Sequence, residues 1–511
     1  MAAATPTIAE LVRAQAAARP AQIALSFEGW ETSFARLDQN ASRIANGLIA
    51  HGCRPGDRIA YLGRNRDQFF ELWLGATKAG AVMVPLNWRL AQPEIETILA
   101  DCRPALVLAD AEFLPALAWV PEPDIFLTGE GGPHPSFAAW RDAQADADPH
   151  RDGDHDAPVL QLYTSGTTGV PKGAMLSNRS LLALRADTPP EHLPAWYRWS
   201  HEDVALVAMP VFHISGAGWG LWALQHGARA VVMAEFDPAR VLDLLVAHHV
   251  TKIILVPTAL SIVCDHPDAA GTDFSFLKCI CYGGAAMPPD LLGRAIQVFD
   301  CGFAQMYGMT ETAGTIVGLP PEDHDPAGNR RMESVGVPLP GVELRIVDVH
   351  GKDLPTGDTG EILIRTRARM TGYYKRPEAT AEAIDPQGWL HTGDAGQLDE
   401  DGYLYLTDRI KNMIITGGEN VYPAEVENAL RSHPQVGDVA VIGVPDPKWG
   451  EAVKAIVVPR GEALPDPAEL IAWARARVAA YKVPKSVDFR SELPRNASGK
   501  VLHRLLREDY G

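Results

Sequence analysis

The sequence is poor in cysteine, with six in 511 residues. They are scattered along the chain, at Cys53, Cys102, Cys264, Cys279, Cys281 and Cys301. So few cysteines in so long a chain do not form a disulfide framework, and no pair has the spacing of a zinc site. Cys279 and Cys281 alternate within "LKCICYGG" as one face of a strand would, so we expect buried, reduced thiols there.

Basic residues are also in short supply. Lysine and arginine number 46 against 64 acidic residues, which gives a formal net charge of −18. A nucleic-acid partner needs a basic face, so this composition excludes that class of function. A small anionic ligand in a locally positive site remains compatible with it.

Targeting and membrane segments are absent from the sequence pattern. The first twenty residues lack the charged-then-apolar layout of a signal peptide and predict an amphipathic helix. The segment nearest to a membrane span, Ala205–Leu224, contains a proline, a histidine and three glycines. We expect a buried strand, a loop and a helix there, no transmembrane segment, and a cytoplasmic protein.

The chain also lacks the phosphate loop of the nucleotide triphosphatases, which needs Gly-Lys followed by serine or threonine. What it has is "YTSGTTGVPKGAML", residues Tyr163–Leu176, where Pro171 precedes Lys172 and Gly173 follows it. Backbone N–H groups of a Gly-rich turn and a nearby lysine still suit a phosphate. Taken alone, the segment has a plain surface turn as its alternative.

The length exceeds the size at which single hydrophobic cores stop growing, so more than one domain is expected. Apolar β-type runs alternate with helical segments, which predicts an α/β fold with βα-layered, mostly parallel sheets. Short strands joined by Gly/Asp turns begin near Gly336, and a small α+β unit follows Arg409, with Pro423 in the first turn of a helix. We predict a large N-terminal domain over 1–410, with a β-rich subdomain at 336–410, and a small C-terminal domain over 411–511.

Two further segments carry chemistry. In "QMYGMTET", Tyr307 can stack on a purine, Thr310 can hydrogen-bond a phosphate and Glu311 can bind Mg²⁺. In "HTGD", Asp394 directly follows a glycine, and its carboxylate can accept from two ribose hydroxyls. A turn cap is the alternative role of Asp394.

Six motifs occur in order over nearly the whole chain: Thr164–Gly173, Tyr282–Ala285, Tyr307–Glu311, Thr392–Asp394, Arg409–Lys411 and Pro494–Lys500. Together they resemble the core motifs of the adenylate-forming superfamily, in its acyl-CoA synthetase and fatty-acid–CoA ligase branch. The resemblance implies a two-step ligase. A carboxylate attacks the α-phosphate of Mg²⁺-bound ATP to give an acyl-adenylate and pyrophosphate, and the thiol of coenzyme A then displaces AMP.

The same resemblance implies roles for individual residues, one set for each part of the substrates. The phosphates would be held by Thr164, Ser165, Gly166, Thr167, Thr168 and Lys172, with Thr310 at the α-phosphate and Glu311 on Mg²⁺. Adenine would lie against Gly284, Ala285 and Tyr307, and ribose against Asp394 and Arg409. Lys500 would bridge the acid's carboxylate and the α-phosphate, which makes it the first catalytic candidate.

For the C-terminal domain the resemblance implies mobility, with Lys411 as the hinge and a loop containing Gly417 and Gly418 at the coenzyme A path. Trp449 is a further candidate for covering coenzyme A. An ordinary exposed lysine and a tryptophan packed on a helix are the alternatives for Lys411 and Trp449.

The segment "MPVFHISGAGWG" resembles the acid-pocket segment of fatty-acyl and aryl-CoA ligases. It places His213, Gly216 and Ala217 beside the acid, and Gly308 and Met309 add small or apolar neighbours. A core histidine satisfied by a backbone carbonyl is the alternative for His213.

A fatty or other apolar acid is the expected substrate. The alternatives are an aryl acid, an amide-forming adenylate enzyme and a catalytically silent nucleotide-binding homologue. Chain length, pathway and oligomeric state stay open, with a homodimer as one alternative.

Overall fold

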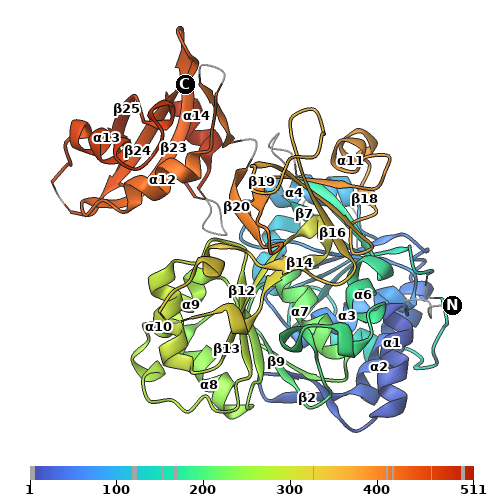
Figure 1. Ribbon diagram of the computed structural model, residues 1–511. Helices are drawn as coiled ribbons and strands as arrows, with labels where there is room; N and C mark the ends of the chain where they lie inside the picture. Colours follow the sequence, from blue (N-terminus) through green and yellow to red (C-terminus); the bar gives the residue numbers. More distant parts are fainter. Residues whose placement is uncertain are drawn as a thin grey trace. The chain divides into compact units, whose positions relative to one another are not determined.

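The computed structural model describes residues 6–117, 124–151, 153–164, 171–325, 327–409, 412–416, 419–461, 463–495 and 501–510. Within them the chain forms two compact units, one of Met1–Glu343 with Arg365–Leu390 and one of Leu344–Ile364 with His391–Gly511. Figure 1 shows the chain coloured along the sequence. The predicted boundary at 410 and 411 lies outside the described residues, so the domain limits stay a prediction.

The first unit is built on a nine-stranded sheet in the order β15-β14-β13-β12-β11-β9-β10-β1-β2. Its strands are β1 (Ile23–Phe27), β2 (Trp30–Ser33), β9 (Val204–Val207), β10 (Arg229–Val232), β11 (Lys252–Leu255), β12 (Cys279–Gly283), β13 (Gly302–Met309), β14 (Gly314–Leu319) and β15 (Val337–Pro338). Neighbouring strands from β1 to β13 run parallel, and β2, β14 and β15 add antiparallel edges.

A seven-stranded sheet in the order β18-β8-β7-β4-β3-β5-β6 accompanies it. Its strands are β3 (Arg58–Leu62), β4 (Val82–Pro85), β5 (Leu106–Ala109), β6 (Asp124–Leu127), β7 (Pro158–Thr164), β8 (Lys172–Ser177) and β18 (Gly372–Tyr373). The strands from β7 to β6 are parallel, whereas β8 and β18 are antiparallel to their neighbours.

Helices pack on both sheets, which confirms the predicted βα layering. They are α1 (Ile8–Ala18), α2 (Phe34–Ala50), α3 (Asp67–Lys78), α4 (Gln92–Cys102), α5 (Phe137–Asp142), α6 (Asn178–Ala186), α7 (Ile214–Gln225), α8 (Pro238–Ala247), α9 (Pro257–Cys264), α10 (Pro289–Phe299) and α11 (Pro377–Ala383). Helices α8, α9 and α10 lie side by side (Figure 1). Helix α3 contacts strands of both sheets and is buried from Phe69 to Lys78, so it forms the core between them.

The second unit holds most of a four-stranded sheet and a separate five-stranded one. Their strands are β16 (Val342–Val347), β17 (Gly360–Thr366), β19 (Leu390–Leu398) and β20 (Leu404–Arg409), then β21 (Ile414–Thr416), β22 (Glu419–Val421), β23 (Val436–Asp446), β24 (Gly450–Pro459) and β25 (Ser486–Phe489). Its helices are α12 (Pro423–Arg431), α13 (Pro467–Arg475) and α14 (His503–Tyr510). Helix α12 begins at Pro423, as its sequence predicts.

Several local predictions are confirmed. The helix predicted near the N-terminus is α1, and the run Ala205–Leu224 contains most of β9 and of α7. Cys279 and Cys281 are buried, free thiols on β12 with their sulfur atoms 3.9 Å apart. In the part of the chain that the structure describes, no helix combines the length and the apolar character needed to cross a membrane.

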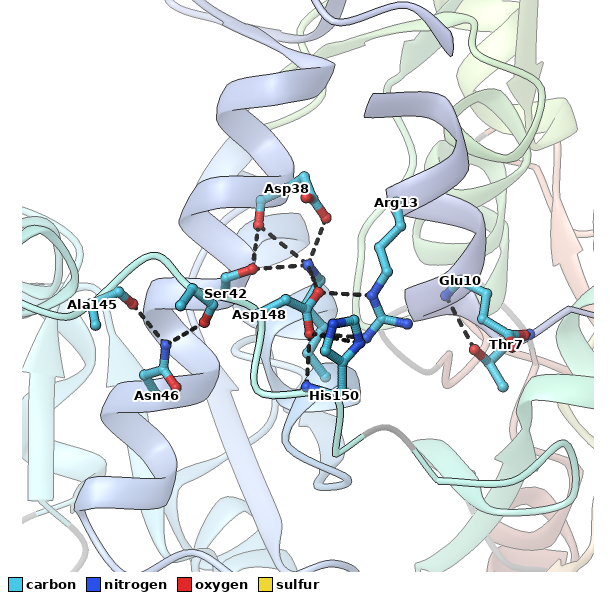
Figure 2. A network of polar contacts seen from close by, with 11 residues as sticks. Thr7, Glu10, Arg13, Asp38, Ser42, Asn46, Ala145, Asp148 and His150 are labelled. Carbon is cyan, nitrogen blue, oxygen red and sulfur yellow. Dashed lines mark hydrogen bonds and ion pairs between the residues drawn. The ribbon is translucent and has the colours of Figure 1, made fainter. Parts of the chain in front are cut away.

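A buried ionic cluster ties α1, α2, α3 and the segment before β7 together. The Lys78 side chain is fully buried, and its Nζ donates to Asp38 Oδ1 at 2.5 Å, to Asp148 Oδ2 at 2.6 Å and to Ser42 Oγ at 2.9 Å. Arg13 adds two hydrogen bonds to Asp148, at 2.7 and 3.0 Å. Figure 2 shows Arg13 and His150 beside the Asp148 carboxylate, and Asp38 and Ser42 on a neighbouring helix.

Burial alone would raise the pKa of Asp148. The hydrogen bonds from Arg13, Lys78 and the backbone N–H of His150 outweigh it and hold the pKa far below its usual value of 3.8. A carboxyl whose pKa is lowered in the folded state stabilises that state above the unfolded pKa and loses the effect as the pH falls. The cluster therefore favours folding at neutral pH and loses strength below about pH 4.

We expect Asp148→Asn to lower the free energy of unfolding at pH 7 by about 3 kcal/mol, because it breaks an ion pair with a buried lysine. Since protonation removes the same charge from the wild type, the difference between the two proteins should narrow as the pH falls below about 4. Asp146→Asn is the control, since Asp146 is exposed and 3.5 Å from its partner Arg43. Chemical unfolding across this pH range measures both effects, and an equal loss for the two variants would contradict the assignment.

Candidate nucleotide and acid site

The carboxyl ends of the parallel strands in the nine-stranded sheet gather three of the predicted segments. The His213 segment follows β9, Gly284 and Ala285 follow β12, and Tyr307 lies near the end of β13. Strands β12 and β13 are neighbours in register, so the two predicted adenine segments leave the sheet side by side. Ligands of open α/β sheets bind at this edge.

The predicted phosphate loop connects β7 and β8 of the other sheet. Thr164 ends β7, Lys172 begins β8, and the two residues are opposite each other in the antiparallel pair. Thr164 Oγ1 donates to the Lys172 carbonyl at 3.5 Å. The remaining predicted phosphate ligands, Ser165, Gly166, Thr167 and Thr168, lie outside the described residues.

Tyr373 brings two predicted catalytic residues together. Its hydroxyl donates to Glu311 Oε1 at 2.8 Å, and the Lys172 ammonium lies 5.2 Å from the centre of its ring. Burial raises the pKa of Tyr373, and the charge of Glu311 and the hydrogen bond to it raise it further. The phenol therefore stays protonated and donates to the carboxylate at any physiological pH.

The residues around Tyr373, which we call the strap (Met370–Tyr374), join the two sheets of the first unit. Met370 N–H donates to the Glu311 carbonyl at 2.7 Å, while Thr371 N–H and Tyr374 N–H donate to β8 carbonyls at 2.9 and 2.8 Å. The sequence near Tyr373 contains no motif that would predict a role for this residue. Its position depends on the pairing of β18 with β8, about two hundred residues earlier.

The turn that carries Glu311 is held by its own side chains. It is a single 3₁₀ turn, Thr310–Thr312, in which Thr312 Oγ1 accepts from Met309 N–H at 3.0 Å and donates to the Gly314 carbonyl at 2.8 Å. Thr310 is half-buried and Glu311 is 7% exposed. Glu311 is thus a fixed carboxylate with one oxygen held by Tyr373.

A single fixed carboxylate fits Mg²⁺ that is bound mostly by water and nucleotide phosphates. Among the described residues, no three His, Cys, Asp or Glu side chains converge on one point, so the fold offers no all-protein metal cage there. Glu311 with the nearby Lys172 therefore suits a Mg²⁺–nucleotide complex better than a permanently held metal.

Gly308 and Gly314 lie back to back where β13 and β14 meet. A Cβ atom at Gly308 would come within 1.9 Å of the Gly314 carbonyl oxygen, so only glycine fits without moving the hairpin. Met309 beside it is half-buried. The indole ring of Trp222, on α7, lies 3.4 Å from a Cβ atom built at Gly314, so α7 packs closely against β14 at this position.

The predicted acid segment forms the start of α7. Gly216 and Ala217 are buried in its first turn, and a Cβ at Gly216 would meet the Pro210 carbonyl at 2.3 Å. His213 precedes the helix with an exposed imidazole that makes no hydrogen bond within the described part of the chain. Crowding by protein atoms and the charge of Arg89 lower its pKa, so it is neutral at pH 7. The alternative of a satisfied core histidine is wrong.

Other predicted residues belong to the second unit. "HTGD" lies within β19, where Gly393 has a φ of +68° and Asp394 is opposite Arg409 of β20. Asp394 is half-buried in a strand, so its alternative role as a turn cap finds no support. Trp449 is 41% exposed, with the Lys448 ammonium 4.5 Å from its ring. Lys411, Gly417, Gly418 and Lys500 lie outside the described residues.

Family models match most of the chain. The model of the AMP-binding enzymes matches residues 12–374, and that of the AMP-binding enzyme C-terminal domain matches residues 425–500. The chain therefore belongs to the AMP-binding enzymes, the adenylate-forming superfamily whose motifs it contains.

Curated relatives and solved structures agree with this assignment. The chain is 41% identical to the fatty acid–[acyl-carrier-protein] ligase ScoC of Streptomyces coeruleorubidus, over 99% of this chain and 96% of the relative. It is 40% identical to a feruloyl-CoA synthase of an Amycolatopsis species, over 96% of each protein. The crystal structure of ATP-bound MatB from Rhodopseudomonas palustris superposes with a TM-score of 0.87 at 31% identity, over 98% of this chain and 99% of MatB.

The contact between Tyr373 and Glu311 gives a direct test of the predicted Mg²⁺ ligand. Tyr373→Phe should weaken ATP binding about tenfold when Mg²⁺ is present, because the carboxylate loses the hydrogen bond that orients it. In EDTA the affinity of the variant should match that of the wild type. Calorimetric titration with and without Mg²⁺ measures the difference.

Tyr374→Phe is the matched control. It removes a hydroxyl from the next residue, whose ring packs against the Arg58 guanidinium at 3.8 Å, away from Glu311. An equal loss of affinity with and without Mg²⁺ in Tyr373→Phe would show that Tyr373 acts on the nucleotide itself.

Proposed function

We propose that the protein is an ATP-dependent acyl-CoA synthetase, an acid–thiol ligase that forms AMP and diphosphate through an acyl-adenylate. One observation carries the proposal: Tyr373 is hydrogen-bonded to Glu311 and its ring contacts Lys172. Lys172 begins β8, directly after the predicted phosphate loop that follows β7. A cation and a carboxylate at this spacing suit a nucleotide whose phosphates also bind Mg²⁺.

In the first step, a carboxylate oxygen of the acid attacks the α-phosphorus and the bond to the bridging oxygen of the β-phosphate breaks. The chain's part is to hold the departing diphosphate with Thr164, Lys172 and the loop between them. Thr310 would contact the α-phosphate. Mg²⁺ on Glu311 would supply further positive charge to the phosphates. Lys500 would reduce the repulsion between the two anions that must meet.

In the second step, a thiolate sulfur attacks the acyl carbon and AMP leaves. We propose that Gly417, Gly418 and Trp449 serve this step, after rotation of the C-terminal domain about Lys411. Asp394 and Arg409 would hold the ribose of the nucleotide. The exposed, neutral His213 would border the acid together with Gly216 and Ala217. These residues would form part of an apolar pocket for a fatty or aryl acid.

Coenzyme A and a carrier protein are competing candidates for the acceptor of the second step. One relative is named for a carrier protein and another for coenzyme A. Coenzyme A is the acceptor proposed here, because the smaller thiol needs only the pantetheine path and no docking surface for a protein. An amine acceptor and a catalytically silent protein are the other candidates.

Pyrophosphate release over a panel of fatty and aryl acids tests the proposal. We expect release that depends on the acid, and a thioester by mass spectrometry when coenzyme A is added. If a product forms only with a phosphopantetheinylated carrier protein or only with amines, that compound replaces coenzyme A as the acceptor. No pyrophosphate with any acid would refute the ligase activity and favour the silent protein.

Lys500→Ala separates the two steps. Pyrophosphate release should fall about a hundredfold or more, because the charge that stabilises the first transition state is lost. Thioester formation from a supplied acyl-adenylate should stay near the wild-type rate. Lys485→Ala, an exposed lysine of the same unit, is the control and should leave both steps unchanged. Equal loss in both steps would remove Lys500 from this role.

A further inference from the structure

Arg185 is a buried arginine held between two aromatic rings. It lies near the end of α6 and is 7% exposed. Its guanidinium carbon is 3.8 Å from the centre of the Tyr197 ring and 3.7 Å from that of the Trp222 ring. The two ring centres are 6.4 Å apart, so the guanidinium lies between them.

Arg185, Tyr197, Trp219 and Trp222, which we call the Arg185 cluster, carry five buried polar atoms with no hydrogen-bond partner in the described part of the chain. Nε and Nη2 of Arg185, the Tyr197 hydroxyl and both indole N–H groups are buried and make no hydrogen bond to any described residue. Each of them can donate a hydrogen bond, so the cluster lacks acceptors. Buried polar groups are almost always satisfied, and so many orphan donors in one place point to a ligand that accepts.

No carboxylate among the described residues forms an ion pair with Arg185. Burial lowers its pKa to about 10, and only Tyr197 and Cys281 act in the opposite direction. Burial raises the pKa of both these groups, so both are neutral at pH 7. Burial lowers the pKa of Lys252 nearby and the charge of Arg185 lowers it further, so Lys252 offers Arg185 no negative charge. Burial lowers the pKa of His226 to about 4, so this imidazole is neutral at pH 7. The buried Lys78 differs, because two carboxylates contact it.

The cluster lies one indole ring away from the candidate site. Atoms at the edge of the Trp222 six-membered ring are 3.4 and 3.5 Å from a Cβ built at Gly314, which follows the Glu311 turn directly. The same edge is 3.7 Å from a Cβ built at Gly218, next to Ala217 in the acid segment. Arg185 contacts the face of that indole, so the Trp222 ring lies against both Arg185 and the acid segment.

We propose that the Arg185 cluster binds a second carboxylate at the far end of the acid, so that the preferred substrate is a dicarboxylic acid with an apolar middle. Nε and Nη2 lie on one edge of the guanidinium and match the two oxygens of a carboxylate, and the indole and phenol groups supply further donors. The inference rests on the proposed function and narrows its substrate class.

Pyrophosphate release from straight-chain diacids and monoacids of equal carbon number tests the substrate class. The wild type should prefer the matching diacid by roughly a hundredfold in kcat/KM, because a monoacid leaves the donors of the cluster unpaired. Arg185→Met should abolish this preference by losing activity on the diacid alone. The change keeps the length of the side chain and removes an unpaired charge, so the variant should fold at least as well as the wild type.

Arg179→Met is the matched control. Arg179 is on the same helix but pairs with Asp156 at the surface, so its removal should leave the acid preference unchanged. Equal rates of the wild type on diacids and monoacids would overturn the inference. Equal loss on both acid classes in Arg185→Met would also overturn it, because Arg185 would then serve packing.

A binding measurement separates this inference from the proposed ligase activity. The matching diacid should raise the Tm of the wild type, and neither the monoacid nor the ω-hydroxy acid of equal length should do so. Arg185→Met should lose the shift. Stabilisation by the diacid without pyrophosphate release would refute the ligase while keeping the site. If monoacids release pyrophosphate and the diacid does not raise the Tm, the proposed ligase activity stands. The inference of a carboxylate site at the Arg185 cluster is then overturned. If the ω-hydroxy acid raises the Tm as much as the diacid does, the inference that the cluster recognises a carboxylate is overturned.

Discussion

The first unit depends on the strap, which is hydrogen-bonded to both sheets at once. Its Met370 N–H bonds to the turn that carries Glu311, and its Thr371 and Tyr374 N–H groups bond to β8, which begins with Lys172. These two side chains come from different sheets, and β8 packs directly against the turn Thr310–Thr312 that carries Glu311. The strap fixes the distance, and Tyr373 then fills the space between the charges.

Around this contact, the fold follows a general rule of parallel sheets. Strands β9, β12 and β13 end at one edge, and the chain leaves each of them in a loop or turn that carries predicted ligand contacts. Helix α3, which is buried along most of its length, forms the core between the two sheets. The ionic cluster around Lys78 lies at the C-terminal end of this helix, where carboxylates balance a buried cation.

Much of this arrangement is predictable from the sequence, because local patterns set it. Alternating apolar segments predict the strands, Pro423 predicts the start of α12, and the ordered motifs predict the family. Tyr373 and the Arg185 cluster are not predictable in this way. Their roles arise from contacts between segments far apart in the chain, and a tyrosine or an arginine in a helical or strand pattern carries no local mark of them. The residues on which the mechanism depends most, Lys500 among them, stay predictions.

The back-to-back packing of Gly308 and Gly314 restricts how the acid preference of such a chain can evolve. Gly308 has no room for a side chain, and a Cβ at Gly216 would meet backbone, so neither position can be enlarged one substitution at a time. Gly218 is different, because its nearest neighbours are the ends of Ile214 and Trp222, which are side chains that can move. If the proposed acid site is correct, substitutions that change its size would be accepted more easily at Gly218 of α7 than at Gly308 or Gly216.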